Sequence, residues 1–222
     1  MADPQMRPPP DLRRAIADDL RPVAPLAPPF RRVVWLMPIA LLMLVAASAI
    51  FGARRDGPAL GLLLTWTASV AQMILGVALT AAALRESVPG TTLSRRALGA
   101  AFGGALFAAV TITWLTWRAS PTVVRPGFAA YVWSVCMAGT MVSALPLLGA
   151  AGWLAARAFP VRPRIAGALY GIGAGLVADA GWRLFCHFSD PVHVLGSHTL
   201  GILLVGILGS LLAVARRSAL PR

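Results

Sequence analysis

The chain contains no lysine, since all 20 basic residues are arginine, and only eight residues are acidic. We attribute the missing lysine to nucleotide composition and not to function. Charged residues make up 13% of the sequence, whereas soluble domains carry about 25%. This scarcity of charge, with 58% hydrophobic residues, excludes an ordinary soluble domain and indicates a membrane protein. The net charge of +12 is spread beside apolar runs, which argues against direct nucleic-acid binding.

Motifs of the common enzyme classes are missing as well. The sequence has no Cys-x-x-Cys, no glycine-rich phosphate loop and no His-Glu-x-x-His. Its two cysteines provide at most one pair, whereas a membrane thiol oxidoreductase needs a relay of pairs. We therefore expect no enzyme and no permanent cofactor, although transient metal binding remains open.

Six apolar runs are long enough to cross a membrane, which takes about 20 residues for a core of about 30 Å. They are Val33–Gly52, Leu60–Leu84, Ala97–Trp117, Phe128–Ala156, Ile165–Phe185 and Val194–Ala215. We predict an all-α polytopic protein with a cytoplasmic arm at 1–32, a six-helix membrane domain at 33–215 and a cytoplasmic tail at 216–222. The proline-rich first 29 residues have no apolar segment of a cleavable signal peptide, so the first run is expected to stay as an anchor.

The arginines predict how these spans are oriented. With the N-terminus on one side, 15 arginines fall on that side and 5 on the other. Because cytoplasmic loops carry the excess of positive charge, both termini should be cytoplasmic.

The arm contains one short amphipathic segment at residues 11–20, enclosed by prolines. Leu12, Ile16 and Leu20 recur every four residues and form one apolar stripe on a helix, with Asp11 as the expected N-cap. A helix of about ten residues is marginal alone in water. It therefore needs a partner: a protein, the membrane surface or the cytoplasmic loops.

The two cysteines, Cys136 and Cys186, both fall towards the outer face. Cys136 is expected about 12 Å into the fourth span and Cys186 at the outer end of the fifth. Either thiol can be merely a small buried apolar residue. A disulfide requires Cα atoms within about 7 Å, which the sequence cannot establish.

Polar side chains follow Cys186, among them His187, Asp190, His193 and His198. Thiolate, imidazole and carboxylate groups suit a borderline-soft metal such as zinc or copper. The spacing matches no standard zinc motif, so solvated loop histidines are the alternative. A metal site made of Cys186, His187 and His193 is a hypothesis at this point.

Asp179 is a charge inside the fifth span, where ionisable groups face partners or water. Arg183 lies four residues later on the same helical face, so we expect an intrahelical ion pair, with a sensing or proton role as the alternative. Gln72 in the second span is expected to bond another helix.

Small residues recur at intervals of four in two spans, at Gly99 and Gly103 and at Gly167, Gly171 and Gly175. Such spacing lets helix backbones approach closely in a bilayer. We expect both sets to pack within the bundle, with a dimer face as the alternative.

Taken together, these features resemble the NrsF-type six-span bacterial anti-sigma factors, which are negative regulators of an extracytoplasmic-function sigma factor. The resemblance covers nearly the whole chain. Its marks are Leu12-Arg-Arg-Ala-Ile-Ala-Asp-Asp-Leu-Arg-Pro-Val23, Pro28-Pro-Phe-Arg-Arg32, Val88-Pro-Gly90, Trp133-Ser-Val-Cys136, Arg162-Pro-Arg164-x-x-Gly167 and Cys186. The residues after Cys186 differ from the Cys-Pro-Glu common among relatives, so the stimulus can differ here.

The resemblance implies a multi-pass protein of the bacterial inner membrane whose cytoplasmic face holds the sigma factor inactive. It also implies that Cys136 and Cys186 are needed for the response to metal or oxidative stress. The arm is the expected sigma-binding segment, with the loops near Arg95 and Arg162 as the alternative. The proposed sigma contacts are Leu12, Arg13, Ile16, Leu20, Arg21 and Pro22.

A membrane permease or metal-handling protein with an outer-face Cys/His site is the second functional hypothesis. Such transporters usually contain paired broken helices and charges near the membrane midplane. The sequence shows neither pattern, which favours a regulator over a transporter.

Overall fold

The computed structural model describes residues 9–20 and 25–218, and within these ranges the chain is helical and has no strand. The first helix, α1 (Pro10–Asp19), has no buried residue. Its apolar stripe is open to the surroundings, with Leu12 and Ile16 each 50% exposed and Leu20 72% exposed. The expected Asp11 cap is wrong: Pro9 is the N-cap residue and no side chain caps the helix. Pro10 instead occupies the first turn, where a missing N–H costs nothing.

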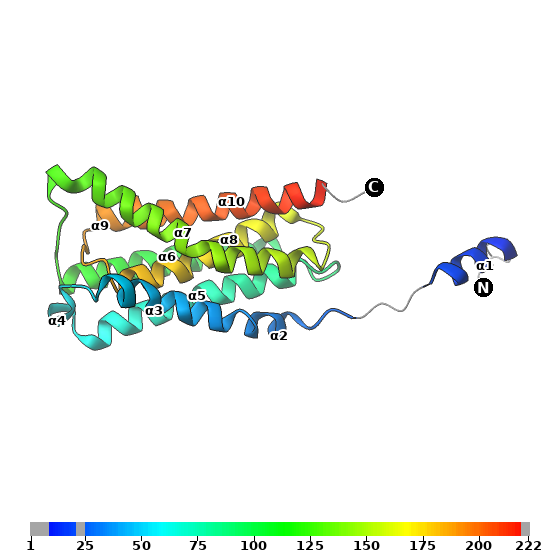
Figure 1. Ribbon diagram of the computed structural model, residues 1–222, viewed down its shortest axis with the longest axis horizontal. Coiled ribbons are helices and arrows are strands. Elements are labelled where there is room, and N and C mark those ends of the chain that lie inside the picture. Colours follow the sequence, from blue (N-terminus) through cyan, green and yellow to red (C-terminus); the bar gives the residue numbers. More distant parts are fainter. Residues whose placement is uncertain (1–8, 21–24, 219–222) are drawn as a thin grey trace.

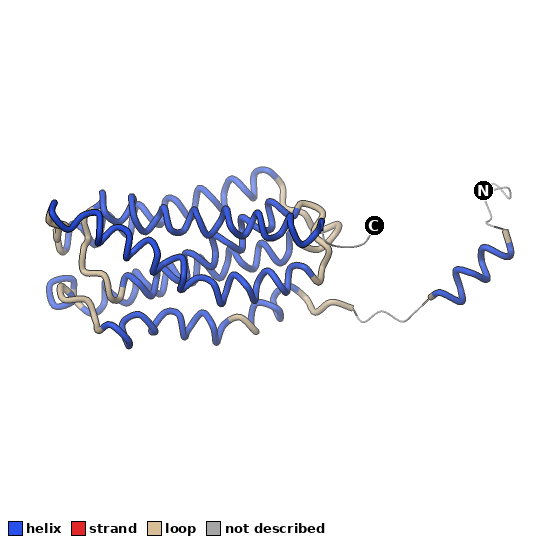
Figure 2. The backbone as a smooth tube through the Cα atoms, turned by 45° about the horizontal axis from the view of Figure 1, so that its top comes forward, coloured by secondary structure: helices blue, strands red, loops and turns tan. Residues whose placement is uncertain are grey.

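Six helical spans form an elongated bundle, which confirms the predicted all-α six-span fold (Figures 1 and 2). Each is long and apolar enough to cross a membrane, as expected for a multi-pass membrane protein. The spans are α2 (Pro29–Val34) with α3 (Met37–Phe51), α5 (Leu62–Glu86), α6 (Arg95–Ala119), η2 (Pro126–Phe128) with α7 (Ala129–Ala156), α8 (Pro163–Arg183), and α9 (Pro191–His193) with η3 (Val194–His198) and α10 (Thr199–Ser218). The short helix α4 (Gly57–Leu60) lies between the first two spans.

The first span begins at Pro29, earlier than the predicted Val33. The span includes Arg32 although this residue is charged, because Arg32 is buried, with 2% exposed, and its guanidinium is hydrogen-bonded. It donates to the carbonyl of Leu84, at 2.9 Å, and to that of Leu154, at 3.4 Å. The division into arm, membrane domain and tail stays a prediction.

Helix α8 is the centre of the bundle. Its apolar stretch is 83% buried, against 11 to 39% for the other five spans. Glycine makes this possible: a Cβ on Gly167 would lie 2.4 Å from the carbonyl oxygen of Gly209 in α10, and one on Gly173 would lie 2.6 Å from that of Gly76 in α5. The α8 backbone therefore touches two neighbouring backbones directly. The contact with α10 confirms the packing that the four-residue spacing predicted, whereas the contact with α5 uses Gly173, which is not part of that spacing.

The other glycine pair behaves differently. A Cβ on Gly99 or Gly103 of α6 would meet no described atom within 4 Å. The prediction that these two glycines pack within the bundle is wrong, because α6 is peripheral and turns this face away from the other described helices.

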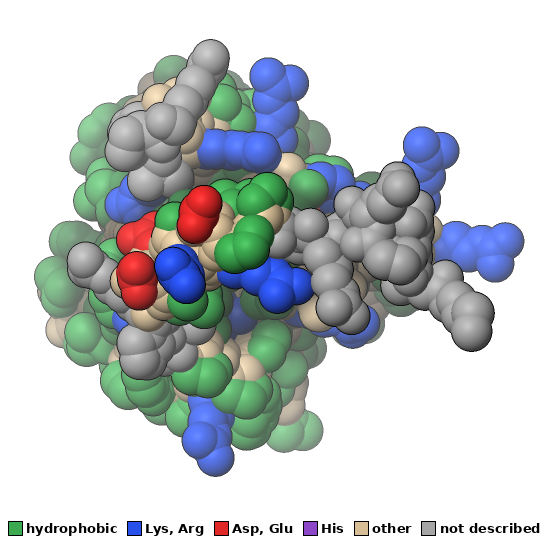
Figure 3. All heavy atoms as spheres, turned by 90° about the vertical axis from the view of Figure 1, so that its right-hand side faces the viewer, with side chains coloured by type: hydrophobic (Ala, Val, Ile, Leu, Met, Phe, Trp, Pro, Cys, Tyr) green, Lys and Arg blue, Asp and Glu red, His purple; other side chains and the backbone are tan. Residues whose placement is uncertain are grey.

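The two ends of the bundle differ in charge. The first span starts and α10 finishes at one end, here called the arginine-rich end (Figures 1 and 3). Its helix ends and loops carry ten of the described arginines, whereas the opposite end, here called the thiol end, carries five. The ten are Arg31, Arg32, Arg85, Arg95, Arg96, Arg157, Arg162, Arg164, Arg216 and Arg217.

A fully buried glutamate holds the arginine-rich end together. Arg162, just before α8, donates from Nε to Oε1 of Glu86, at 2.6 Å, and from Nη2 to Oε2, at 2.8 Å. The backbone N–H of Leu93 also donates to Oε2, at 2.7 Å, and the Leu93 carbonyl accepts from Arg162. This two-pronged ion pair fastens α5, the loop that follows it and the start of α8 to one another.

Candidate functional site: a buried thiol and histidine cluster

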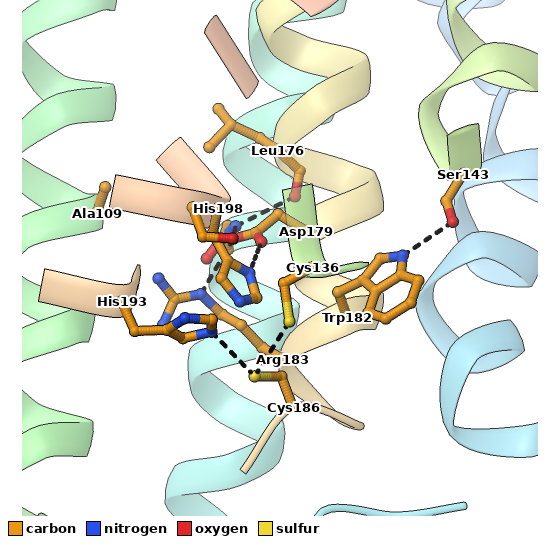
Figure 4. A network of polar contacts seen from close by, with 12 residues as sticks. Ala109, Cys136, Ser143, Leu176, Asp179, Trp182, Arg183, Cys186, His193 and His198 are labelled. Carbon is orange, nitrogen blue, oxygen red and sulfur yellow. Dashed lines mark hydrogen bonds and ion pairs between the residues drawn. The ribbon is translucent and has the colours of Figure 1, made fainter. Parts of the chain in front are cut away.

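The two cysteines lie side by side at the thiol end. Cys136 in α7 and Cys186, just beyond α8, are 4% and 5% exposed, and their Sγ atoms are 3.8 Å apart (Figure 4). Both thiols are free. The expected difference in depth is absent because α7 begins beyond the end of α8, which brings its third turn level with Cys186 (Figure 1).

Two histidines complete the cluster. Nε2 of His193 lies 3.5 Å from Sγ of Cys186, and one donor atom from each of Cys136, Cys186, His193 and His198 lies within 4.8 Å of the others. All four residues are buried. Thiol and imidazole groups so placed can bind a soft metal, and the two thiols can also take part in redox chemistry.

A local change of helix type brings the histidines together. Five residues apart on an α-helix, His193 and His198 would point about 140° away from each other. Residues 194–198 instead form a turn of π-helix, η3, in which Thr199 N–H bonds the carbonyl of Val194. This wider turn places the two rings 5.1 Å apart between centroids.

Tryptophans fix the neighbouring segments around the cluster. Trp133 in α7 packs closely on Gly196 of η3, so closely that a Cβ on Gly196 would lie 2.8 Å from the indole ring. The backbone carbonyl of Trp133 also accepts a hydrogen bond from the Ser197 hydroxyl, at 2.8 Å. Trp182 in α8 donates from Nε1 to Oγ of Ser143 in α7, at 2.9 Å. The ends of α7, α8 and η3 are thus held in place beside the thiols.

Asp179 connects the cluster to the rest of the bundle (Figure 4). Its Oδ1 accepts from Nδ1 of His198 at 2.5 Å, and its Oδ2 accepts from Gln72 at 2.6 Å and from Nε of Arg183 at 3.2 Å. Arg183 also donates to the hydroxyl of Thr113 in α6, at 3.3 Å. The predicted Asp179–Arg183 pair and the interhelical bond of Gln72 are confirmed, and one carboxylate joins α5, α8 and η3.

The hypothesised metal ligands are only partly brought together. Cys186 and His193 lie in the cluster, whereas His187 lies outside it, with its ring packed at a tilt against Phe188, 4.2 Å between centroids. Its carbonyl accepts a hydrogen bond from Thr122. Asp190, also near Cys186 in sequence, caps α9.

The structure adds two donors to the hypothesised set, Cys136 and His198. Helical periodicity gave no reason to pair His198 with His193, because only the π turn aligns them. The interval of five residues between them was the one available signal.

The thiol of Cys186 lies outside the helical spans. The hydrogen bond from Cys136 holds the pKa of Cys186 below its ordinary value, and the hydrogen bond with His193 acts in the same direction, while burial opposes both. A thiol with a depressed pKa is more readily the thiolate, which is the form that reacts and binds metals.

The expected sigma contacts lie in the N-terminal arm, before the first span. Leu12, Arg13 and Ile16 belong to the exposed helix α1, and Leu20 is the exposed C-cap residue that follows it. Arg21 and Pro22 lie outside the described residues.

Comparison with known proteins gives one result. The family model described as NrsF, negative regulator of sigma F, matches residues 16–216, which is nearly the whole chain and includes all four members of the cluster. No curated protein and no solved structure matches the chain significantly.

Proposed function

The chain belongs to the NrsF family of negative regulators of sigma F, and from this we propose that it is a membrane-bound anti-sigma factor for an extracytoplasmic-function sigma factor. It holds the sigma factor at the bacterial inner membrane and releases it when Cys136 and Cys186 sense metal or oxidative stress. The observation that carries the proposal is the family match over residues 16–216. The buried, adjacent thiols support the sensing step.

The arginine-rich end faces the cytoplasm in this proposal. Ten described arginines at the helix ends and loops there, against five at the thiol end, favour this orientation, because positive charge is retained on the cytoplasmic side. The thiols then lie on the oxidising, metal-exposed side of the membrane, while the sigma factor binds on the other.

The contact with the sigma factor is made by α1. Its stripe of Leu12, Ile16 and Leu20 is exposed, and so short a helix needs a partner to be stable. Amphipathic helices of this kind dock into apolar grooves, and Arg13 and Arg14 suit an acidic rim around such a groove.

The signal travels along α8. Its outer end adjoins the thiols, and its inner end begins next to Arg162, which grips Glu86 of α5. Because its glycines put its backbone directly against α5 and α10, a small shift at the thiols cannot be absorbed by flexible side chains. Two alternative packings of these helices, one favoured by the altered thiols, would link the two sites.

Capture of the sigma factor tests the proposal. Detergent-solubilised protein, intact or lacking residues 1–28, is incubated with each sigma factor of the same cell. The truncation leaves the first span complete, since α2 begins at Pro29. Capture by the intact form only supports binding through the arm, and capture by both moves the contact to the loops near Arg95 and Arg162. Capture by neither overturns the proposal and favours a permease or metal-handling protein.

A further inference from the structure

We propose that Cys136, Cys186, His193 and His198 form a tetrahedral site for a borderline-soft divalent cation such as Zn²⁺. Asp179 would orient one of the ligating histidines. The inference deepens the proposed function, on which its biological meaning rests, because it names the ligand of the sensing site. It differs from the set suggested by the sequence in gaining Cys136 and His198 and losing His187.

The distances match a tetrahedral site. Zinc binds sulfur at about 2.3 Å and imidazole nitrogen at about 2.0–2.1 Å, so a tetrahedron has S···S edges of about 3.8 Å and S···N edges of about 3.6 Å. The Sγ atoms of Cys136 and Cys186 are 3.8 Å apart, and Sγ of Cys186 is 3.5 Å from Nε2 of His193. The remaining donor separations are no more than 4.8 Å, so ligation needs movements of only about 1 Å.

A buried nitrogen is available to complete the ligand set. Because a carboxylate only accepts hydrogen bonds, His198 donates from Nδ1 to Asp179, and in the neutral imidazole, the form that ligates metals, this leaves Nε2 as the acceptor nitrogen. Among the described residues this Nε2 is buried without a hydrogen-bond partner, which is costly in an apolar interior. A metal ion would satisfy it. Carboxylate, histidine and metal in a row form the arrangement that usually orients a histidine ligand.

The charges of the site also fit a divalent cation. When M²⁺ replaces the two thiol protons, the products are a neutral dithiolate complex and two released protons. Asp179 is already paired with Arg183, so the occupied cluster adds no net charge to the buried region. Thiolate and imidazole ligands favour Zn²⁺ and similar cations over Mg²⁺ and Ca²⁺, which prefer oxygen.

The four ligands belong to three separate segments. Cys136 is in α7 and Cys186 follows α8, while His193 ends α9 and His198 ends η3, both at the start of the last span. A bound ion would draw these segments together at one end of α8. That constraint is the kind of differential contact that a ligand needs to select one packing of the helices.

Cobalt provides the test, because Co²⁺ takes zinc sites and its visible spectrum distinguishes tetrahedral thiolate coordination. Full-length protein in detergent, reduced and freed of metal, is titrated first with Co²⁺ and then with Zn²⁺. We expect one equivalent of Co²⁺ with an intense tetrahedral spectrum and a thiolate charge-transfer band, both abolished by one equivalent of Zn²⁺. A weak octahedral spectrum, or none, would overturn the proposal.

Variants identify the ligands. Cys136→Ser and His198→Ala are expected to weaken Co²⁺ binding at least 100-fold or to change its spectrum, and Asp179→Asn about 10- to 100-fold with a tetrahedral spectrum retained. His187→Ala is the matched control and should bind like the unaltered protein. Equal Co²⁺ binding by His198→Ala and His187→Ala would show that His198 is not a ligand. Should a variant not fold, as judged by its helical circular dichroism, the spectrum of the unaltered protein still reports the number of thiolates.

The outcomes for the site and for the proposed function are separable. Tetrahedral Co²⁺ binding with no sigma capture would retain the site and remove the anti-sigma role. Sigma capture that responds to oxidants through Cys136 and Cys186, with no Co²⁺ binding, would remove the site and retain the anti-sigma role.

Discussion

Oδ1 of Asp179 lies 2.5 Å from Nδ1 of His198, although the two residues are 19 positions apart and belong to different spans. Through its other oxygen the same carboxylate bonds Gln72 of α5 and Arg183 of α8. Asp179 therefore stands between the thiol cluster and the helices that run to the arginine-rich end. Altering Asp179 therefore tests whether the cluster is coupled to the rest of the bundle.

Replacing Asp179 with asparagine should impair induction while repression persists. Asparagine keeps the size of the side chain but removes the charge that pairs with buried Arg183, so we also expect a loss of about 1–3 kcal/mol in unfolding free energy. A reporter from a sigma-dependent promoter and thermal unfolding in detergent measure the two effects. Asp190→Asn, in the half-buried loop nearby, is the control. Normal induction in Asp179→Asn would exclude this carboxylate from signalling.

Cys136→Ser and Cys186→Ser should each abolish induction and leave basal repression unchanged. Serine fills nearly the same space, so the bundle and α1 are preserved, but its hydroxyl neither ligates soft metals nor oxidises as a thiol does. The same reporter, read with and without metal or oxidant, checks this expectation. Ser134→Ala, exposed on α7, is the matched control and should respond normally. A full response in both cysteine variants would end the thiol-sensing hypothesis.

The same substitution, glycine to alanine, should destabilise the protein at one position and leave it unaffected at another. Gly171→Ala puts a Cβ 2.5 Å from the carbonyl oxygen of Val205, which forces α8 and α10 apart. We expect a loss of about 1–3 kcal/mol, typical of overpacking, and a lower midpoint of thermal unfolding. Gly103→Ala adds its methyl group where no described atom lies within 4 Å and should leave the midpoint unchanged. Equal midpoints for both variants would contradict the close packing of α8 on α10.

Glu86→Gln should loosen the arginine-rich end. It removes the charge of an ion pair at 2.6 Å and weakens the acceptor that holds the Leu93 N–H. Hydrogen exchange at residues 87–94 is expected to accelerate, and the unfolding midpoint to fall. Arg85→Gln, an exposed neighbour on the same helix, is the control and should exchange at the original rate. Unchanged exchange in Glu86→Gln would show that the pair does not order this loop.

Two variants that each add one negative charge, at adjacent positions of α1, test whether the apolar stripe binds the sigma factor. Ile16→Glu places a carboxylate within the stripe, whereas Ala17→Glu places it on another face of the same exposed helix. Sigma capture should fall at least tenfold for Ile16→Glu and little for Ala17→Glu. An equal loss in both variants would point to general electrostatics instead of apolar docking.

Some of these features are determined by the sequence alone. Six apolar runs predict six spans because backbone polar groups in a bilayer must be satisfied within helices. The interval of four residues places Asp179 beside Arg183, and a glutamine in an apolar run must find a polar partner, as Gln72 does. These predictions depend only on helix geometry and on the cost of burying polar groups.

Tertiary structure determined the rest. The sequence gives Gly103 and Gly167 the same four-residue spacing, but only Gly167 faces another backbone, because α6 is peripheral and α8 is central. Cys136 meets Cys186 because α7 extends past the end of α8, and His198 joins His193 because one turn widens to π. Relative helix heights and a local change of helix type arise from the packing of whole helices. They cannot be inferred from the residue pattern of any single segment.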